Sequence, residues 1–240
     1  MRRARRILLL LLPLAALVLG LLALRDYARR FPQDLPWTAL DLRHPVGAFT
    51  GRKLAGLAGD PGRCRALLAQ AGAAFTALPD RPESARCGLR DAVRFGAREI
   101  GYRPADVGFA CPVAAALLVW EREVVQVAAQ RHFGRRVSGI DHFGAYSCRR
   151  IYGRREGAWS EHARANAFDV AGFRLADGTR IGVVGDWQDP GPKGRFLREV
   201  RDGACRLFAT VLSPDYNQAH RDHLHLDQAG RGEWGWRACR

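Results

Sequence analysis

Two short segments rich in histidine and aspartate constrain this chain more than any other feature. The first runs Ser160-Glu-His162-Ala-Arg-Ala-Asn-Ala-Phe-Asp169, and the second is Asp222-His223-Leu-His225. A histidine and an aspartate seven residues apart, completed by a His-x-His pair, supply three zinc-type ligands and one spare base. Zinc hydrolases use this set, because three protein ligands leave a fourth coordination position open. The pattern therefore predicts a fold that brings two distant segments to one point.

Strand geometry predicts which histidine binds the metal. Residues 223–227 alternate as a strand does, so His223, His225 and Asp227 share one face. Asp169 lies near the start of another predicted strand, and His162 lies in the loop before it. We therefore expect His162, Asp169 and His225 to bind one Zn²⁺ per chain, while His223 faces the substrate.

The first segment resembles the S-x-H-x-x-G-x-A-x-D signature of the D-alanyl-D-alanine metallopeptidases, whose superfamily also holds lysostaphin-type endopeptidases and the hedgehog signalling domain. The wider context more closely resembles the bacterial extensin-like C-terminal domain family, over roughly residues 35–240. It runs from Tyr146-Ser-Cys148-Arg149 through Ser160-Glu-His162 to His220-Arg-Asp222-His223-Leu-His225-Leu-Asp227. The resemblance implies a zinc site built on a small antiparallel sheet.

The resemblance also implies roles for the residues around the metal ligands. In the His-x-His branch of the superfamily the first histidine acts in catalysis, a role that would belong to His223. In the carboxypeptidase branch a glutamate stands three residues before the last zinc histidine, and Asp222 occupies that position here. Asp222 is therefore the second candidate for the base, or a partner that orients a histidine ligand.

Three upstream residues are candidates for contact with the substrate. Related carboxypeptidases place an arginine before the first zinc histidine, where it stabilises the oxyanion or holds a substrate carboxylate. The resemblance implies this role for Arg149, with an ordinary salt bridge as the alternative, and implies substrate contacts for Tyr146 and Ser160. Ser160 is also well suited to cap a turn.

Two departures from the peptidase pattern leave a second interpretation open. Ala165 stands where the signature has glycine, and the glutamate of the carboxypeptidase branch is missing. The alternative to an enzyme is therefore a zinc-containing module that binds cell-wall peptide or a partner protein without turnover.

The N-terminus predicts export and membrane anchoring. Four arginines lie in the first six residues and precede the apolar run Ile7–Leu24, whose eighteen residues are just enough to span a bilayer. The basic flank stays inside, so the rest of the chain faces out. We expect an uncleaved signal anchor at 1–24, a juxtamembrane linker at 25–36 and a periplasmic domain at 37–240. A cleaved signal peptide, which releases the domain, is the alternative.

An even number of cysteines agrees with export, because disulfides persist in oxidising compartments. The six cysteines are Cys64, Cys87, Cys111, Cys148, Cys205 and Cys239. We expect three disulfides among the fifteen possible pairings, with Cys64–Cys87 as the most local option. A cysteine zinc cluster is disfavoured because no C-x-x-C spacing occurs.

The formal net charge of +14 comes almost entirely from arginine. A nucleic-acid binder is one interpretation of such a charge, but the arginines are scattered and no nucleic-acid motif accompanies them. Arginine-rich, lysine-poor usage is typical of a GC-rich genome. We therefore expect no nucleic-acid partner, and a basic surface would also suit an anionic cell-wall polymer or membrane surface.

Hydrophobic periodicity predicts an α+β domain, in which helices pack on one side of a small antiparallel sheet that carries the zinc site. The predicted helices span 62–78, 112–133 and 194–212, and the predicted strands span 137–140, 168–175, 180–184 and 223–227. Asp177-Gly178 is a strong hairpin signal between two of these strands. The combined prediction is a membrane-anchored zinc peptidase that acts on peptidoglycan peptides.

Overall fold

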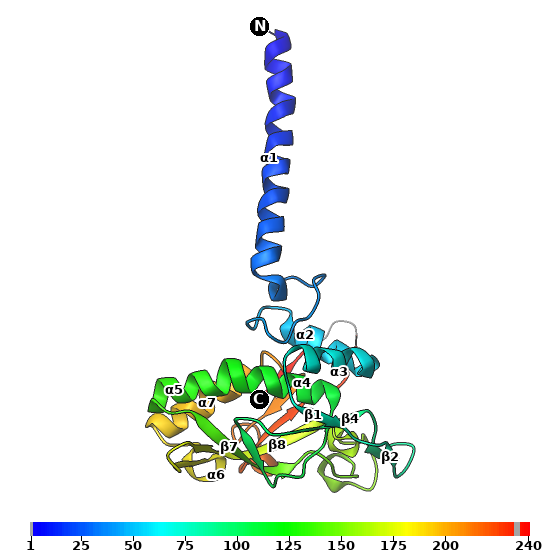
Figure 1. Cartoon of the computed structure of the whole chain (residues 1–240), viewed down its shortest axis with the longest axis vertical. Coiled ribbons are helices and arrows are strands. Elements are labelled where there is room, and N and C mark those ends of the chain that lie inside the picture. The colour runs from blue at the N-terminus through cyan, green and yellow to red at the C-terminus, as the bar shows by residue number, and fades with distance from the viewer. Residues whose placement is uncertain (1, 233–235) are drawn as a thin grey trace.

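The computed structural model describes residues 2–232 and 236–240. Its longest element is α1 (Arg2–Arg30), which extends away from the rest of the chain as a rod (Figure 1). The segment Leu11–Arg30 is long and apolar enough to cross a membrane, and none of it is buried against the domain. Helix α1 continues through Arg30 into the predicted juxtamembrane linker at 25–36.

Short helices lie on the side of the domain nearest α1 (Figure 1). They are η1 (Pro32–Asp34), α2 (Thr50–Ala55), η2 (Gly56–Gly59) and α3 (Pro61–Gln70). Asp60 caps α3 by accepting a hydrogen bond from the Arg63 amide, with Pro61 in the first turn. The predicted helix over 62–78 is wrong beyond Gln70, because the chain turns at Gly72, whose φ is +74°.

The predicted helix over 112–133 is confirmed as one continuous run. It comprises α4 (Cys111–Trp120), a π-helical turn η3 (Glu121–Val125) and α5 (Gln126–Phe133), and Gly134 ends it with a φ of +61°. Trp120 is fully buried and donates its indole N–H to the Val200 carbonyl at 2.9 Å, which supports a core role for this residue. The π-helical turn was not predicted.

The second long helix, α7 (Pro192–Ala204), is shorter than predicted. The predicted span of 194–212 is wrong after Ala204, because Thr210–Leu212 forms strand β10 instead. Pairing of β10 with two neighbouring strands outweighs the local helical pattern of these residues. Helices α4, α5 and α7 cover one side of strands β7 and β8 (Figure 1).

The main sheet carries the candidate functional residues. Its strand order is β12-β10-β11-β8-β7-β5, and β9 pairs with β8. The strands are β5 (Gly101–Arg103), β7 (Val137–Gly144), β8 (Ala167–Leu175), β9 (Arg180–Gly182), β10 (Thr210–Leu212), β11 (Leu224–Asp227) and β12 (Ala238–Cys239). The hairpin predicted at Asp177-Gly178 is confirmed by the β8–β9 pairing, while α6 (Val183–Asp186) takes up the end of the predicted 180–184 strand.

Smaller strands and turns complete the α+β fold. One small sheet holds β1 (Phe75–Ala77), β4 (Ala92–Phe95) and β6 (Phe109–Ala110), and another pairs β2 (Arg81–Pro82) with β3 (Gly88–Leu89). The 3-10 turns η4 (Ile151–Gly153), η5 (Glu161–Arg164) and η6 (Gln218–His220) lie in the segments before β8 and β11. The predicted fold class is therefore confirmed as a mixed α+β domain with an apolar N-terminal helix.

All six cysteines are paired in three disulfides, as predicted. The pairs are Cys64–Cys111, Cys87–Cys148 and Cys205–Cys239. The predicted local pair Cys64–Cys87 is wrong. Cys64 lies on α3 and Cys111 begins α4, so packing of these two helices determines this pairing rather than distance along the chain.

Candidate metal centre

Three buried side chains from separate elements converge on one point. His162 Nε2 lies 3.1 Å from Asp169 Oδ2 and 3.2 Å from His225 Nδ1, and that Nδ1 lies 2.9 Å from Asp169 Oδ1. All three residues are buried. Sequence spacing had singled out this same set of residues as a ligand group.

Local structure explains how the three side chains meet. Strands β8 and β11 are antiparallel, and their register places His225 directly opposite Asp169. His162 lies in the turn η5, which begins where Ser160 Oγ accepts a hydrogen bond from the His162 amide at 3.3 Å. The turn ends at Ala165, whose φ of +53° lies in the left-handed region that favours glycine. The glycine of the resembled signature would fit this backbone position without strain.

Both histidines have their second ring nitrogen held in place. His162 Nδ1 lies 3.0 Å from the Ala145 carbonyl oxygen, and His225 Nε2 lies 3.1 Å from Asp227 Oδ2. Each of these nitrogens donates to its oxygen acceptor when the ring is neutral, which leaves the opposite nitrogen with a lone pair aimed at the centre. Metal-binding histidines are oriented by this kind of partner. Strand alternation predicted that Asp227 shares a face with His225, but it did not predict this hydrogen bond.

The donor set fits a zinc ion. Four ligands at 2.0–2.1 Å in a tetrahedron lie about 3.3 Å from one another. This spacing is close to the 3.1 and 3.2 Å that separate His162 Nε2 from Asp169 Oδ2 and from His225 Nδ1. Burial alone would raise the pKa of the Asp169 carboxyl, but hydrogen bonds from His162 and His225 hold it well below its ordinary value. Burial alone would lower the pKa of His225, yet hydrogen bonds to Asp169 and Asp227 raise it to about 9. The two carboxylates therefore stabilise positive charge at this point.

A second pair of residues lies beside the ligand group. His223 is half-buried, and its Nε2 lies 3.6 Å from Asp169 Oδ1 while its Nδ1 lies 2.9 Å from Asp222 Oδ1. Asp222 thus orients the His223 ring and leaves Nε2 facing the ligand group. The two candidates for the general base therefore form one hydrogen-bonded unit, in which His223 is the member nearer the centre.

His220 extends this row of histidines. Its ring centroid lies 5.2 Å from that of His223 and 5.9 Å from that of His225, and its Nδ1 lies 2.8 Å from Asn217 Oδ1. Burial, reinforced by the neighbouring charges of His225 and His223, lowers the pKa of His220 to about 4. His220 is therefore neutral at pH 7.

The predicted substrate contacts lie in different places. Arg149 is exposed and close enough to His220 for its charge to act on that ring, and its carbonyl accepts a hydrogen bond from the Ser160 amide at 3.1 Å. Ser160 caps η5, which was the alternative interpretation of this residue. Tyr146 lines a separate pocket with Arg81 and Leu89.

Exposed aromatic residues that were not predicted as site residues flank His220 and His223. Phe143, which is 62% exposed, lies 5.7 Å from His223 between ring centroids. Tyr152 and Tyr216 are also exposed, and their centroids lie 6.4 and 5.8 Å from that of His220. Asn217 Nδ2 donates to the Tyr152 hydroxyl at 3.1 Å, which fixes a residue whose φ is +58°. No local sequence signal marks these residues, because the fold alone brings them to the histidines.

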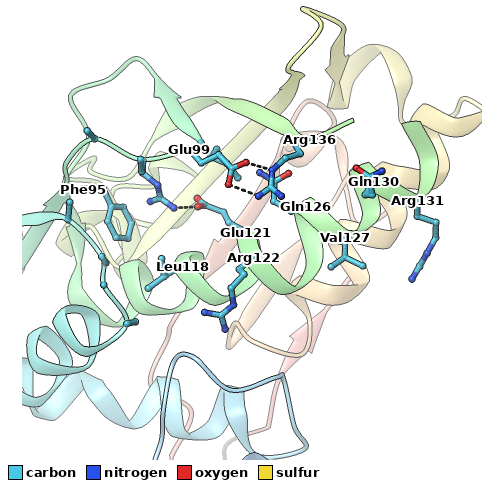
Figure 2. A pocket seen from close by; sticks show the side chains of 17 residues that line it. Phe95, Glu99, Leu118, Glu121, Arg122, Gln126, Val127, Gln130, Arg131 and Arg136 are labelled. Carbon is cyan, nitrogen blue, oxygen red and sulfur yellow. Dashed lines mark hydrogen bonds and ion pairs between the residues drawn. The ribbon is translucent and has the colours of Figure 1, made fainter. Parts of the chain in front are cut away.

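A larger pocket lies elsewhere in the domain, beside the π-helical turn. Figure 2 shows its lining, which includes Glu99, Glu121 and Arg136, around a volume of about 790 Å³. Its charges are paired with one another, since Arg98 binds Glu121 and Arg136 binds Glu99. Arg122 and Arg131, which also line the pocket, pair with Glu123 and Glu199. Because each charged group of the lining has an ion-pair partner, we assign the candidate site to the histidine cluster.

Comparison with known proteins identifies one family. Residues 62–240 match the family described as the extensin-like protein C-terminus. No curated protein and no solved structure matches the chain. The matched region begins in α3 and contains the whole histidine cluster.

Proposed function

This chain belongs to the extensin-like C-terminal family, and we propose that it is a membrane-anchored zinc peptidase that hydrolyses peptide bonds of peptidoglycan in the periplasm. The observation that carries the proposal is the convergence of His162 Nε2, His225 Nδ1 and the Asp169 carboxylate, whose two oxygens lie 3.1 Å from the first nitrogen and 2.9 Å from the second, while the nitrogens lie 3.2 Å apart. Two histidines and one carboxylate form the ligand set of several zinc peptidases.

Each residue of the site has a separate role in the proposed hydrolysis. His162 Nε2, Asp169 and His225 Nδ1 would hold a zinc ion, which would supply Lewis-acid polarisation of the scissile carbonyl and lower the pKa of water. His223 Nε2 accepts the proton of the attacking water and passes it to the leaving amine. Asp222 keeps His223 in the tautomer that has a free Nε2, since it accepts the hydrogen bond of Nδ1. Arg149 stabilises negative charge that develops on the substrate.

The surroundings of the centre support a large, exported substrate. The exposed rings of Phe143, Tyr152 and Tyr216 flank the histidines, which gives an extended peptide or glycan-linked peptide apolar surface to lie on. Three disulfides suit an oxidising compartment, and an apolar N-terminal helix suits export. These features agree with peptidoglycan peptides as the substrate class, of DD-carboxypeptidase or endopeptidase type.

One observation favours a second function. The carboxylate of Asp222 is engaged with His223, so this aspartate does not replace the glutamate base of the carboxypeptidase branch. If His223 does not act as the base, the same centre would serve a zinc-containing module that grips cell-wall peptide or a partner protein without turnover.

The experiment that tests the proposal starts with metal content. We expect elemental analysis to find about one zinc per purified full-length chain, and none in the His162→Ala/His225→Ala variant. Incubation with peptidoglycan followed by mass spectrometry should then release peptide fragments with the wild type alone. Zinc content without fragments would favour the binding module, and a folded wild type without metal would overturn both functions.

A further inference from the structure

The joint between α1 and the domain is held by a network of hydrogen bonds. Lys53, on α2, donates from its Nζ to the Pro32 carbonyl and to Thr38 Oγ1, both at 2.9 Å, and to Gln33 Oε1 at 3.3 Å. This lysine is one of only two in the chain. Its three acceptors lie within the segment of residues 25–38, which we name the collar.

A second set of contacts ties the collar to the residues directly before α2 and to α1 itself. The Phe49 amide donates to the Gln33 carbonyl at 2.9 Å, and the Ala48 amide donates to Asp34 Oδ1 at 2.8 Å. The Tyr27 hydroxyl, on the last turns of α1, donates to Asp34 Oδ2 at 2.9 Å. Together with Lys53, these bonds make the collar a rigid connection rather than a flexible linker.

The length of the collar matches the headgroup layer of a bilayer. The apolar run ends at Leu24, and α1 continues to Arg30, which adds about 9 Å at 1.5 Å per residue. The polar headgroup region on each side of a membrane is about 5–8 Å thick. When α1 spans the bilayer, the collar therefore lies within this layer and at its outer boundary.

The side chains of the collar have the chemistry of this layer. Tyr27, Phe31 and Trp37 are exposed, and Trp37, at 68%, is the most exposed aromatic residue in the described part of the chain. Aromatic side chains with a polar edge are typical of membrane interfaces. Exposed arginines accompany them at positions 25, 29 and 30, and Arg30 forms an ion pair with Asp26 at 2.9 Å. Anionic lipids attract cations such as Arg25 and Arg29.

We propose that the collar is a lipid-binding surface, which takes anionic phospholipid headgroups of the membrane that α1 crosses and holds the domain at a fixed height and orientation. The proposal rests on the membrane anchoring in the proposed function and is independent of the zinc chemistry. Because the collar is rigidly attached to the domain, binding of its exposed aromatic residues and arginines to headgroups fixes the distance and orientation of the domain relative to the membrane.

Fluorescence quenching in nanodiscs tests where Trp37 lies. The full chain, with α1 verified by intact mass, is placed in phosphatidylcholine nanodiscs that carry bromine atoms near the headgroup. Bromine quenches nearby tryptophans, so we expect quenching in the wild type that is largely lost in Trp37→Phe and kept in the control Trp159→Phe. Equal quenching in the wild type and Trp37→Phe would overturn the proposal. A purified chain whose mass shows that α1 has been cleaved off would overturn it as well.

Hydrogen exchange tests the preference for anionic lipid. We expect amides of the collar to exchange more slowly when phosphatidylglycerol is included in the nanodisc. Each arginine near an anionic surface shifts the docked population about fivefold, so Arg25→Gln/Arg29→Gln should remove most of this protection. Arg154→Gln/Arg155→Gln, on the loop before His162, is the matched control and should keep it. Identical exchange in both lipids would contradict a headgroup site.

The zinc content of the same samples separates this proposal from the proposed function. If lipid changes Trp37 quenching or collar exchange while the chain lacks zinc, the collar is a lipid-binding surface and the peptidase proposal fails. If the chain holds zinc and neither Trp37 fluorescence nor collar exchange changes with lipid, only the proposal of a lipid-binding collar fails.

Discussion

His223 and His225 lie two residues apart, yet each is oriented by a different aspartate. Asp222 holds His223 Nδ1 at 2.9 Å, and Asp227 holds His225 Nε2 at 3.1 Å. Loss of a carboxylate that orients a metal ligand typically weakens metal affinity 10- to 100-fold. We expect about that loss of zinc affinity in Asp227→Asn, measured by competition with a chelator.

The matched variant Asp222→Asn changes the other carboxylate of the pair. We expect it to keep wild-type zinc affinity and to slow release of peptide fragments by at least about tenfold, because it alters only the orientation and tautomer of His223. A loss of zinc in Asp222→Asn equal to that in Asp227→Asn would contradict the division of roles between the two histidines.

The turn that carries His162 depends on a small residue at position 165. Ala165 is fully buried with a φ of +53°, a conformation that is strained for side chains with a Cβ and most strained for β-branched ones. We expect Ala165→Gly to change the free energy of unfolding by less than about 1 kcal/mol, and Ala165→Val to lower it by about 2–4 kcal/mol. Urea denaturation measures both, and equal stability of the two variants would contradict the assigned backbone strain.

At the scale of elements, the buried carboxylate of Glu121 joins the π-helical turn η3 to β5 and to the segment that precedes β5. Glu121 accepts hydrogen bonds from Arg98 and from the Tyr102 hydroxyl, and Arg98 stacks 4.1 Å from the centre of the Phe95 ring. Removing one member of a buried ion pair leaves the other charge uncompensated, at a cost of about 3–5 kcal/mol. We expect Arg98→Met to lower the free energy of unfolding by about 3 kcal/mol, as measured by urea denaturation.

The double variant Arg98→Met/Glu121→Leu is the control, because it removes both charges. We expect it to recover most of the lost stability, since apolar replacement of a buried pair is often neutral. A double variant less stable than Arg98→Met would show that the pair itself stabilises η3.

Local patterns predicted those elements whose neighbours agree with them. Alternation over 223–227 predicted β11, and Asp177-Gly178 predicted the β8–β9 hairpin. The helical pattern over 194–212 failed at its end, because β10 gains two strand partners that are distant in sequence. The convergence of His162, Asp169 and His225 was predictable from residue types and spacing. Phe143 and Tyr216 were not, because only tertiary packing places them beside the histidines.

At the scale of the whole molecule, the disulfides tie separate parts of the chain to the candidate centre. Cys87–Cys148 joins the β2–β3 hairpin to the segment that supplies the Ala145 carbonyl and leads to His162. Cys205–Cys239 joins the end of α7 to β12 at the edge of the main sheet. The two bonds close loops of similar order, with sequence separations of 61 and 34, so each should stabilise the domain by about 4 kcal/mol.

Their effects on the metal should differ, because only the first bond restrains a segment that positions a ligand. We expect Cys87→Ala/Cys148→Ala to lose both stability and zinc affinity, since the Ala145 carbonyl no longer fixes the His162 ring. Cys205→Ala/Cys239→Ala should lose a similar amount of stability and keep zinc affinity near the wild-type value. Urea denaturation and chelator competition on full-length chains measure the two quantities separately. Parallel loss of zinc in both variants would mean that the centre responds to global stability and that the Cys148 segment does not position His162.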